Sequence, residues 1–153
     1  MHKLYVGLGS NLGNKEQNLN QAIQFIEERI GTIIAQSAFI STASWGYESK
    51  NLFLNAAILC DTLLSPHEVL RQLQQIEVEM GRVHTKEEYE DRIIDLDILF
   101  YDDLIINSQK LAIPHPYIQQ RLFVLIPLME IAPDFIHPQL NQTIKQLQHS
   151  IKE

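Results

Sequence analysis

Two aspartates interrupt an otherwise apolar segment, Ile94-Asp95-Leu96-Asp97-Ile98. If this segment is a β-strand, both carboxylates point to one face, because successive side chains alternate. They would lie about 7 Å apart, with Phe100 on the opposite, apolar face. Mg²⁺ prefers a few carboxylates together with phosphate oxygens and waters. The pair could therefore hold a cation beside a phosphate, although spacing alone also fits a solvated strand face.

A second pair of residues could recognise a flat heteroaromatic ring. Phe53 and Asn55 alternate onto one face of a strand-like segment and place an apolar ring beside an amide. Such a ligand needs a stacking surface and hydrogen bonds in the plane of its ring. Plain core packing of Phe53 is the alternative that the sequence leaves open.

The surrounding segments predict the elements that position these residues. Strand-like residues cover 4–9, 33–42, 53–62 and 93–101, and a hairpin is expected through 102–103. One helix is predicted between Asn14 and Gly31, and a second begins at Ser65-Pro66 and ends at Gly81. Shorter helices are predicted over 128–132 and 143–152. This order predicts an α+β, ferredoxin-like sandwich with an antiparallel sheet and helices packed on it. We expect residues 1–153 to form a single domain.

Composition limits the classes of partner. The chain has 153 residues, of which 45% are hydrophobic and 20% charged, and a formal net charge of −7. This charge argues against a nucleic-acid or anionic membrane surface, since both need a basic face. No run approaches the roughly 18 apolar residues of a membrane span. The single cysteine, Cys60, is expected to be a buried hydrophobe, and the cytoplasm is the expected location.

Several motifs, in order along nearly the whole chain, resemble those of 6-hydroxymethyl-7,8-dihydropterin pyrophosphokinases. They are Gly9-Ser10-Asn11-Leu12-Gly13, Phe53-Leu54-Asn55-Ala56-Ala57, Ile76-Glu77-Val78-Glu79-Met80-Gly81-Arg82, Arg92-Ile93-Ile94-Asp95-Leu96-Asp97-Ile98-Leu99, Pro114-His115-Pro116, Arg121-Leu122-Phe123-Val124-Leu125-Ile126-Pro127-Leu128 and Glu130-Ile131-Ala132-Pro133. The resemblance implies a pyrophosphokinase domain that transfers pyrophosphate from ATP to the hydroxymethyl group of the pterin in folate biosynthesis. AMP would be the other product, and ATP would be the co-substrate.

The resemblance also implies residue roles. Asp95 and Asp97 would bind two Mg²⁺ ions, and Arg82 and Arg92 would complete the catalytic set by stabilising the phosphates. Implied ATP-binding residues are Gln74, Glu77, His84, Tyr89, Arg92, Ile98, His115 and Arg121. Implied pterin-binding residues are Thr42, Ala43, Trp45, Phe53, Asn55 and Phe123, with Phe53 and Phe123 on the two sides of the ring. The implied partners are these two small molecules, with no nucleic acid and no membrane, and the protein would be a monomer.

The loop before the aspartates departs from the family pattern. It reads His84-Thr85-Lys86-Glu87-Glu88-Tyr89-Glu90-Asp91, where many members have a basic, tryptophan-containing stretch. Tyr89 can still stack on adenine, but the added carboxylates should weaken ATP binding unless they point outward. Tyr117 likewise stands where a basic residue often follows the Pro-His-Pro motif. Two other functions stay open: a ferredoxin-like small-molecule or metal-sensing domain, and another Mg²⁺-dependent nucleotidyl or phosphoryl transferase.

Overall fold

The computed structural model describes residues 1–42, 52–81 and 93–151. Its main sheet has the order β2-β4-β1-β5, and the short strand β3 pairs with β4 beyond the end of β2. All of these pairings are antiparallel. The strands are β1 (His2–Ser10), β2 (Gly31–Gln36), β3 (Ile40–Thr42), β4 (Phe53–Thr62) and β5 (Asp95–Tyr101). This order confirms the predicted ferredoxin-like sandwich.

The two long helices begin at the predicted capping residues. The side chain of Asn14 accepts a hydrogen bond from the Gln17 amide at the start of α1 (Lys15–Arg29). Ser65 and Glu68 form a reciprocal capping box at the start of α2 (Pro66–Glu79). Gly81 follows α2 with a φ of 99°, the left-handed conformation that glycine adopts most readily.

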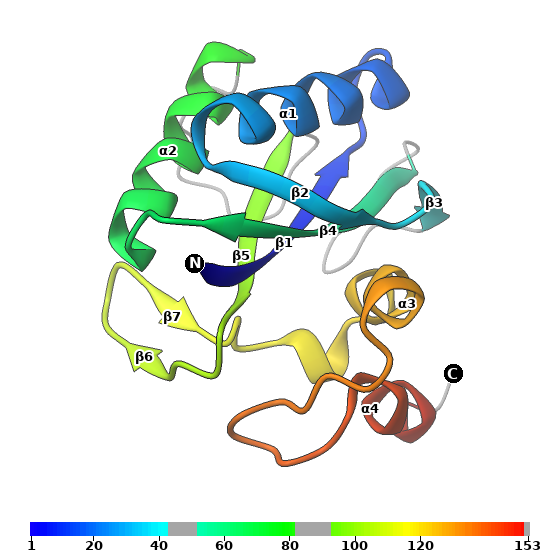
Figure 1. The fold of residues 1–153 in the computed structure, drawn as a ribbon. Helices are drawn as coiled ribbons and strands as arrows, with labels where there is room; N and C mark the ends of the chain where they lie inside the picture. The colour runs from blue at the N-terminus through cyan, green and yellow to red at the C-terminus, as the bar shows by residue number, and fades with distance from the viewer. Residues whose placement is uncertain (43–51, 82–92, 152–153) are drawn as a thin grey trace.

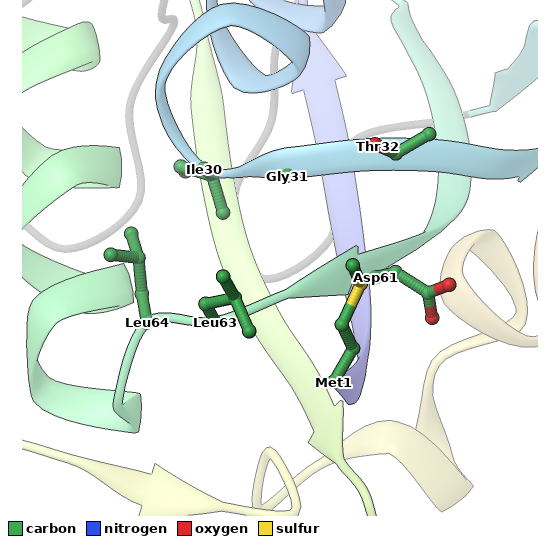
Figure 2. A pocket seen from close by; sticks show the side chains of 7 residues that line it. All are labelled: Met1, Ile30, Gly31, Thr32, Asp61, Leu63 and Leu64. Carbon is green, nitrogen blue, oxygen red and sulfur yellow. The ribbon is translucent and has the colours of Figure 1, made fainter.

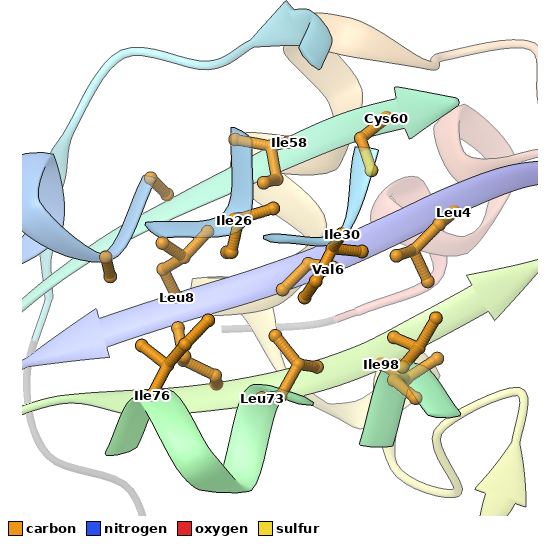
Figure 3. Packing of buried hydrophobic residues seen from close by; sticks show 14 of the residues in the cluster. Leu4, Val6, Leu8, Ile26, Ile30, Ile58, Cys60, Leu73, Ile76 and Ile98 are labelled. Atoms are coloured by element: carbon orange, nitrogen blue, oxygen red, sulfur yellow. The ribbon is translucent and has the colours of Figure 1, made fainter. Parts of the chain in front are cut away.

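The helices lie on both sides of the sheet (Figure 1). On one side, α1 and α2 pack on alternate strand residues in a large apolar cluster that includes Val6, Ile58, Leu73 and Ile98 (Figure 3). On the other side, Leu125 and Leu128 of α3 (Leu122–Ile131) and residues of α4 (Ile144–Ser150) pack on a second cluster. None of the helices in the described part of the chain is long and apolar enough to cross a membrane.

A bulge in β5 corrects one detail of the predicted strand. Val6 pairs with Ile98 and Tyr5 pairs with Phe100, so Leu99 is an extra residue on β5. The bulge ends the simple alternation, and Phe100 joins the α3–α4 cluster instead of the face with Ile98. The expectation that Phe100 lies opposite the aspartates was therefore wrong.

Three other boundaries differ from the sequence prediction. Gly31 does not end α1 in a left-handed conformation but opens β2, where an added Cβ would lie 1.9 Å from the Asp61 carbonyl oxygen. The turn at 102–103 exists, but β6 (Ile106–Asn107) pairs with β7 (Ala112–Ile113) and not with β5. Helix α3 begins at Leu122, six residues before its predicted start. It contains Pro127, which disfavours a helix locally, and the packing of Leu125 and Leu128 in the second cluster stabilises it.

Candidate active site

Two aspartates and an amide meet across three neighbouring strands. Asp95 and Asp97 of β5 pair with Gly9 and Gly7 of β1, and Asn55 of β4 pairs with Gly9 from the other side. Directly paired residues project to the same face, so Asn55 and both carboxylates share one side of the sheet. The glycines between them carry no side chains. An added Cβ at Gly7 would lie 3.3 Å from the Leu99 side chain, so the floor between the acidic edge and β4 is the Gly9 position. The strand register confirms that both aspartates share a face.

The floor at Gly9 is closely bordered by the residues that were predicted to recognise a ring. An added Cβ at Gly9 would lie 3.1 Å from the Asn55 Oδ1 and 3.5 Å from the Phe53 ring. Asn55 is buried, and its side-chain amide donates a hydrogen bond of 2.6 Å to the hydroxyl oxygen of Thr42 on β3. This bond fixes the orientation of the amide and keeps its oxygen on the side of Gly9. An amide acceptor and a phenyl ring therefore border Gly9, one strand away from the acidic strand.

The segment after β7 brings His115 to the aspartates. The His115 amide donates to the Leu99 carbonyl at 3.1 Å, and its ring Nε2 lies 4.0 Å from the Asp97 Oδ1. Burial, reinforced by Arg121 and opposed by Asp95, lowers the pKa of His115 to about 4. The imidazole is therefore neutral near pH 7, and the 4.0 Å separation is not an ion pair. Its Nδ1 accepts from the Tyr117 amide at 3.4 Å, so Nε2 carries the proton and can donate to an anion.

The start of α3 supplies a cation and a second ring. The Arg121 guanidinium carbon lies 5.2 Å from the Tyr117 ring centroid and 5.6 Å from that of Phe123. Both distances are within the range of a cation–π interaction. Since α3 packs on the same side of the sheet as Leu99 and Ala57, Arg121 and Phe123 belong to the side that carries the aspartates. Figure 1 shows α3 on this side, away from α1 and α2.

Glu77 is buried against the acidic strand. It is 7% exposed, and its Oε2 accepts a hydrogen bond of 2.9 Å from the Leu96 amide, the residue between the two aspartates. Leu96 lies on the edge strand β5, so this amide points away from β1 and toward α2. Glu77 therefore satisfies a backbone donor of the acidic strand. Its contact with ATP stays a prediction that this burial does not favour.

The other predicted ATP residues divide by exposure. Gln74 is exposed on α2, whereas Ile98 is 5% exposed and packs in the core cluster with α2. Any contact between Ile98 and ATP would therefore use its backbone. The remaining predicted site residues lie outside the described residues; they are Ala43, Trp45, Arg82, His84, Tyr89 and Arg92.

A shallow pocket of about 180 Å³ lies at the far end of the sheet (Figure 2). It is lined by Met1, Leu63 and Leu64, beside Gly31 and Asp61. These residues flank the start of β1 and the end of β4, whereas Gly9 and Phe53 lie at the opposite strand ends. The pocket is therefore separate from the acidic face.

Comparison with known proteins decides between the functions left open. Residues 5–133 match the family model of 7,8-dihydro-6-hydroxymethylpterin-pyrophosphokinase. A 2-amino-4-hydroxy-6-hydroxymethyldihydropteridine pyrophosphokinase of Methylorubrum extorquens is 39% identical over 137 residues, which cover 89% of this chain and 86% of that protein. The protein of the same name from Aquifex aeolicus is 37% identical over 148 residues, which cover 95% and 90%. The chain belongs to this pyrophosphokinase family.

A solved structure supports the fold of this family member. The wild-type HPPK-DHPS protein of Plasmodium falciparum superposes with a TM-score of 0.81 at 19% identity. The match covers 97% of this chain but 44% of that one, so the chain spans less than half of the larger protein. At this identity the match supports the fold alone. The activity follows from the family model and the curated relatives.

Sequence reasoning missed two features of the candidate site. Gly9 lies between Asp95 and Asn55, and the alternation of Gly7 and Gly9 with Val6 and Leu8 along β1 was a signal that could have shown it. Tyr117 contacts the His115 ring and the Arg121 guanidinium, but sequence reasoning noted only its departure from the family pattern. None of these three residues is an Asp, Glu, His or Lys, so a search for the commonest catalytic acids and bases does not find them.

Proposed function

We propose that the acidic face of β5 is the centre at which this family member transfers pyrophosphate from ATP to 6-hydroxymethyl-7,8-dihydropterin. One observation carries the proposal. Asp95 and Asn55 lie opposite the same residue, Gly9, on the two sides of β1. The groups suited to a metal and to a pterin therefore converge over one glycine floor.

Asp95 and Asp97 fit Mg²⁺. They present carboxylate oxygens, the ligands that this ion prefers, on one half-exposed strand face. Among residues 1–42, 52–81 and 93–151, no group of three His, Cys, Asp or Glu side chains could hold a metal by itself. Phosphate oxygens and waters would complete the coordination, and we propose two ions. Bound Mg²⁺ would neutralise the charge on the triphosphate and orient it.

The reaction needs the β-phosphorus of ATP accessible to the hydroxymethyl oxygen and the leaving AMP held in place. The hydroxymethyl oxygen forms a bond to the β-phosphorus, the bond from that phosphorus to the α–β bridging oxygen breaks, and AMP leaves with this oxygen. The hydroxyl proton passes to solvent. His115 would donate its Nε2 proton to a phosphate oxygen, and the Arg121 guanidinium would contact the same group. Arg82 and Arg92 would add positive charge at the transferred group.

The pterin would lie over the glycine floor. Phe53 and Phe123 would stack on its faces, and Asn55, oriented by Thr42, would bond its edge. Ala43 and Trp45 would complete this side. On the ATP side we propose Gln74, His84, Tyr89 and the Ile98 backbone. Glu77 would act there through the acidic strand, whose Leu96 amide it binds. We also propose one domain over 1–153, a monomer, and a cytoplasmic location.

The test neutralises the acidic face without changing its shape. Asp95→Asn and Asp97→Asn should each lower kcat by more than a hundredfold and leave the melting temperature within a few degrees, since both side chains are partly exposed. Asp103→Asn, at the opposite end of β5 and exposed, is the matched control and should keep full activity. Activity of the two site variants equal to that of the control would remove the acidic face from the reaction.

A further inference from the structure

An aromatic residue outside the predicted site contacts two of the predicted ATP-binding residues. Tyr117 is 44% exposed and precedes the short 3₁₀ helix Ile118–Gln120. The Arg121 guanidinium lies 5.2 Å from its ring centroid, and the His115 ring lies 6.3 Å away in an edge-on arrangement at 63°. One side chain therefore contacts both the imidazole beside Asp97 and the Arg121 guanidinium.

The backbone of Tyr117 also acts on His115. Its amide donates to the Nδ1 of His115 at 3.4 Å. This bond selects the tautomer with the proton on Nε2, the nitrogen that lies 4.0 Å from the Asp97 Oδ1. The Tyr117 turn thus sets both the position and the donor atom of the imidazole.

The ring of Tyr117 restricts Arg121. A guanidinium is planar and stacks on aromatic faces, and here Tyr117 and Phe123 lie 5.2 and 5.6 Å from it. A long arginine side chain that is already held loses less entropy when it binds an anion. The two rings differ in their proposed contact with substrate, because Phe123 would contact the pterin and Tyr117 would not.

We propose that Tyr117 is a positioning residue, which holds Arg121 and His115 in the arrangement that receives the ATP phosphates. This inference rests on the proposed phosphate contacts of Arg121 and His115. It assigns a role to the ring of Tyr117, through Arg121, and none to direct contact with either substrate. Since the side chain is half exposed, its loss should change ATP affinity more than stability.

The experiment measures the affinity of the Mg²⁺ complex of α,β-methylene-ATP, which cannot release AMP, by calorimetry. Tyr117→Leu should weaken binding about two- to fivefold, the range of an exposed cation–π contact, and raise the KM for ATP more than the KM for the pterin. Tyr117→Phe keeps the ring and should bind within a factor of 1.5 of the wild type. A variant with 3,4,5-trifluorophenylalanine at this position keeps the shape but weakens the quadrupole, and should behave like Tyr117→Leu.

Two controls separate this inference from the function on which it rests. Phe25→Leu removes the cation–π contact of Arg29 on α1, 4.5 Å from that ring, and should leave ATP affinity unchanged. Arg121→Ala tests the underlying phosphate contact. If Arg121→Ala loses affinity and Tyr117→Leu does not, the role of Tyr117 is wrong and the phosphate contact stands. If neither variant loses affinity, both are wrong. Equal loss in Tyr117→Phe and Tyr117→Leu would overturn the role of the ring.

Discussion

Replacement of Glu77 by glutamine and by methionine would show what its buried carboxylate does. Both variants remove the charge and keep similar volume. Glutamine retains an acceptor for the Leu96 amide, which the carboxylate now binds at 2.9 Å, whereas methionine does not. Both variants remove the cost of burying a charged carboxylate, so the difference between their free energies of unfolding measures the hydrogen bond to Leu96.

The expected difference follows from the burial of both partners. Glu77 is 7% and Leu96 is 6% exposed, so water cannot readily replace the lost acceptor. A buried donor without a partner costs about 1–3 kcal/mol. The free energy of unfolding of Glu77→Met should therefore be lower than that of Glu77→Gln by about 1–3 kcal/mol, and its urea midpoint should be lower as well. For a chain of this length the melting temperature should differ by about 2–4 °C per kcal/mol.

The assay combines urea unfolding, followed by circular dichroism, with calorimetric affinity for the Mg²⁺ complex of α,β-methylene-ATP. If Glu77 supports the strand that carries the aspartates, Glu77→Gln should bind this ligand nearly as well as the wild type. Equal stability of the two variants, together with a similar loss of affinity in both, would refute this reasoning. Glu77 would then be a direct ligand of the nucleotide.

Three further predictions concern the floor, the ring and an imidazole remote from the site. Gly9→Ala should weaken pterin binding by about 1–2 kcal/mol with ATP affinity unchanged, because the new Cβ meets the Asn55 oxygen at 3.1 Å; unchanged pterin affinity would contradict this placement. Phe123→Leu should weaken pterin binding by about 1–3 kcal/mol in the same titration, and a stable variant with wild-type affinity would reduce the ring to packing. The Nδ1 of His137 accepts hydrogen bonds from two backbone amides, and burial lowers the pKa of this imidazole. Its contribution to stability is therefore complete above about pH 6.5, the pKa of an unfolded histidine, and is lost as the pH falls. The free energy of unfolding of His137→Gln should therefore fall less than that of the wild type between pH 7 and pH 5. Equal falls in the two proteins would show that His137 does not cause the loss of stability at low pH.

Local sequence signals predicted most of the frame. The predicted strand 53–62 has the same bounds as β4, because its apolar alternation is regular and Pro66 marks the following helix. The Ser65 cap and the Gly81 end of α2 are equally local. By contrast, the Leu99 bulge depends on how β1 pairs with β5, and two adjacent apolar residues do not reveal which one is extra. Helix α3 is apolar from Leu122 to Met129, so no helical alternation of apolar and polar residues marked its start.

The candidate site was predictable where one strand carried it. Alternation placed Asp95 with Asp97 and Phe53 with Asn55, and the structure keeps both pairs. Which residues of β4 and β5 lie opposite each other across β1 depends on the long-range strand register, and no short segment of the sequence predicts it. The hydrogen bond between Glu77 and the Leu96 amide could not be predicted for the same reason, since the two residues are 19 positions apart.

The most direct test of the central claim is the identity of the nucleotide product. Protein, Mg²⁺, ATP and 6-hydroxymethyl-7,8-dihydropterin would be incubated together and followed by phosphorus NMR. Attack at the β-phosphorus predicts AMP and the pterin pyrophosphate in equal amounts, with no AMP when the pterin is omitted. Formation of ADP and a pterin monophosphate, or AMP with free pyrophosphate and unchanged pterin, would contradict the proposed transfer.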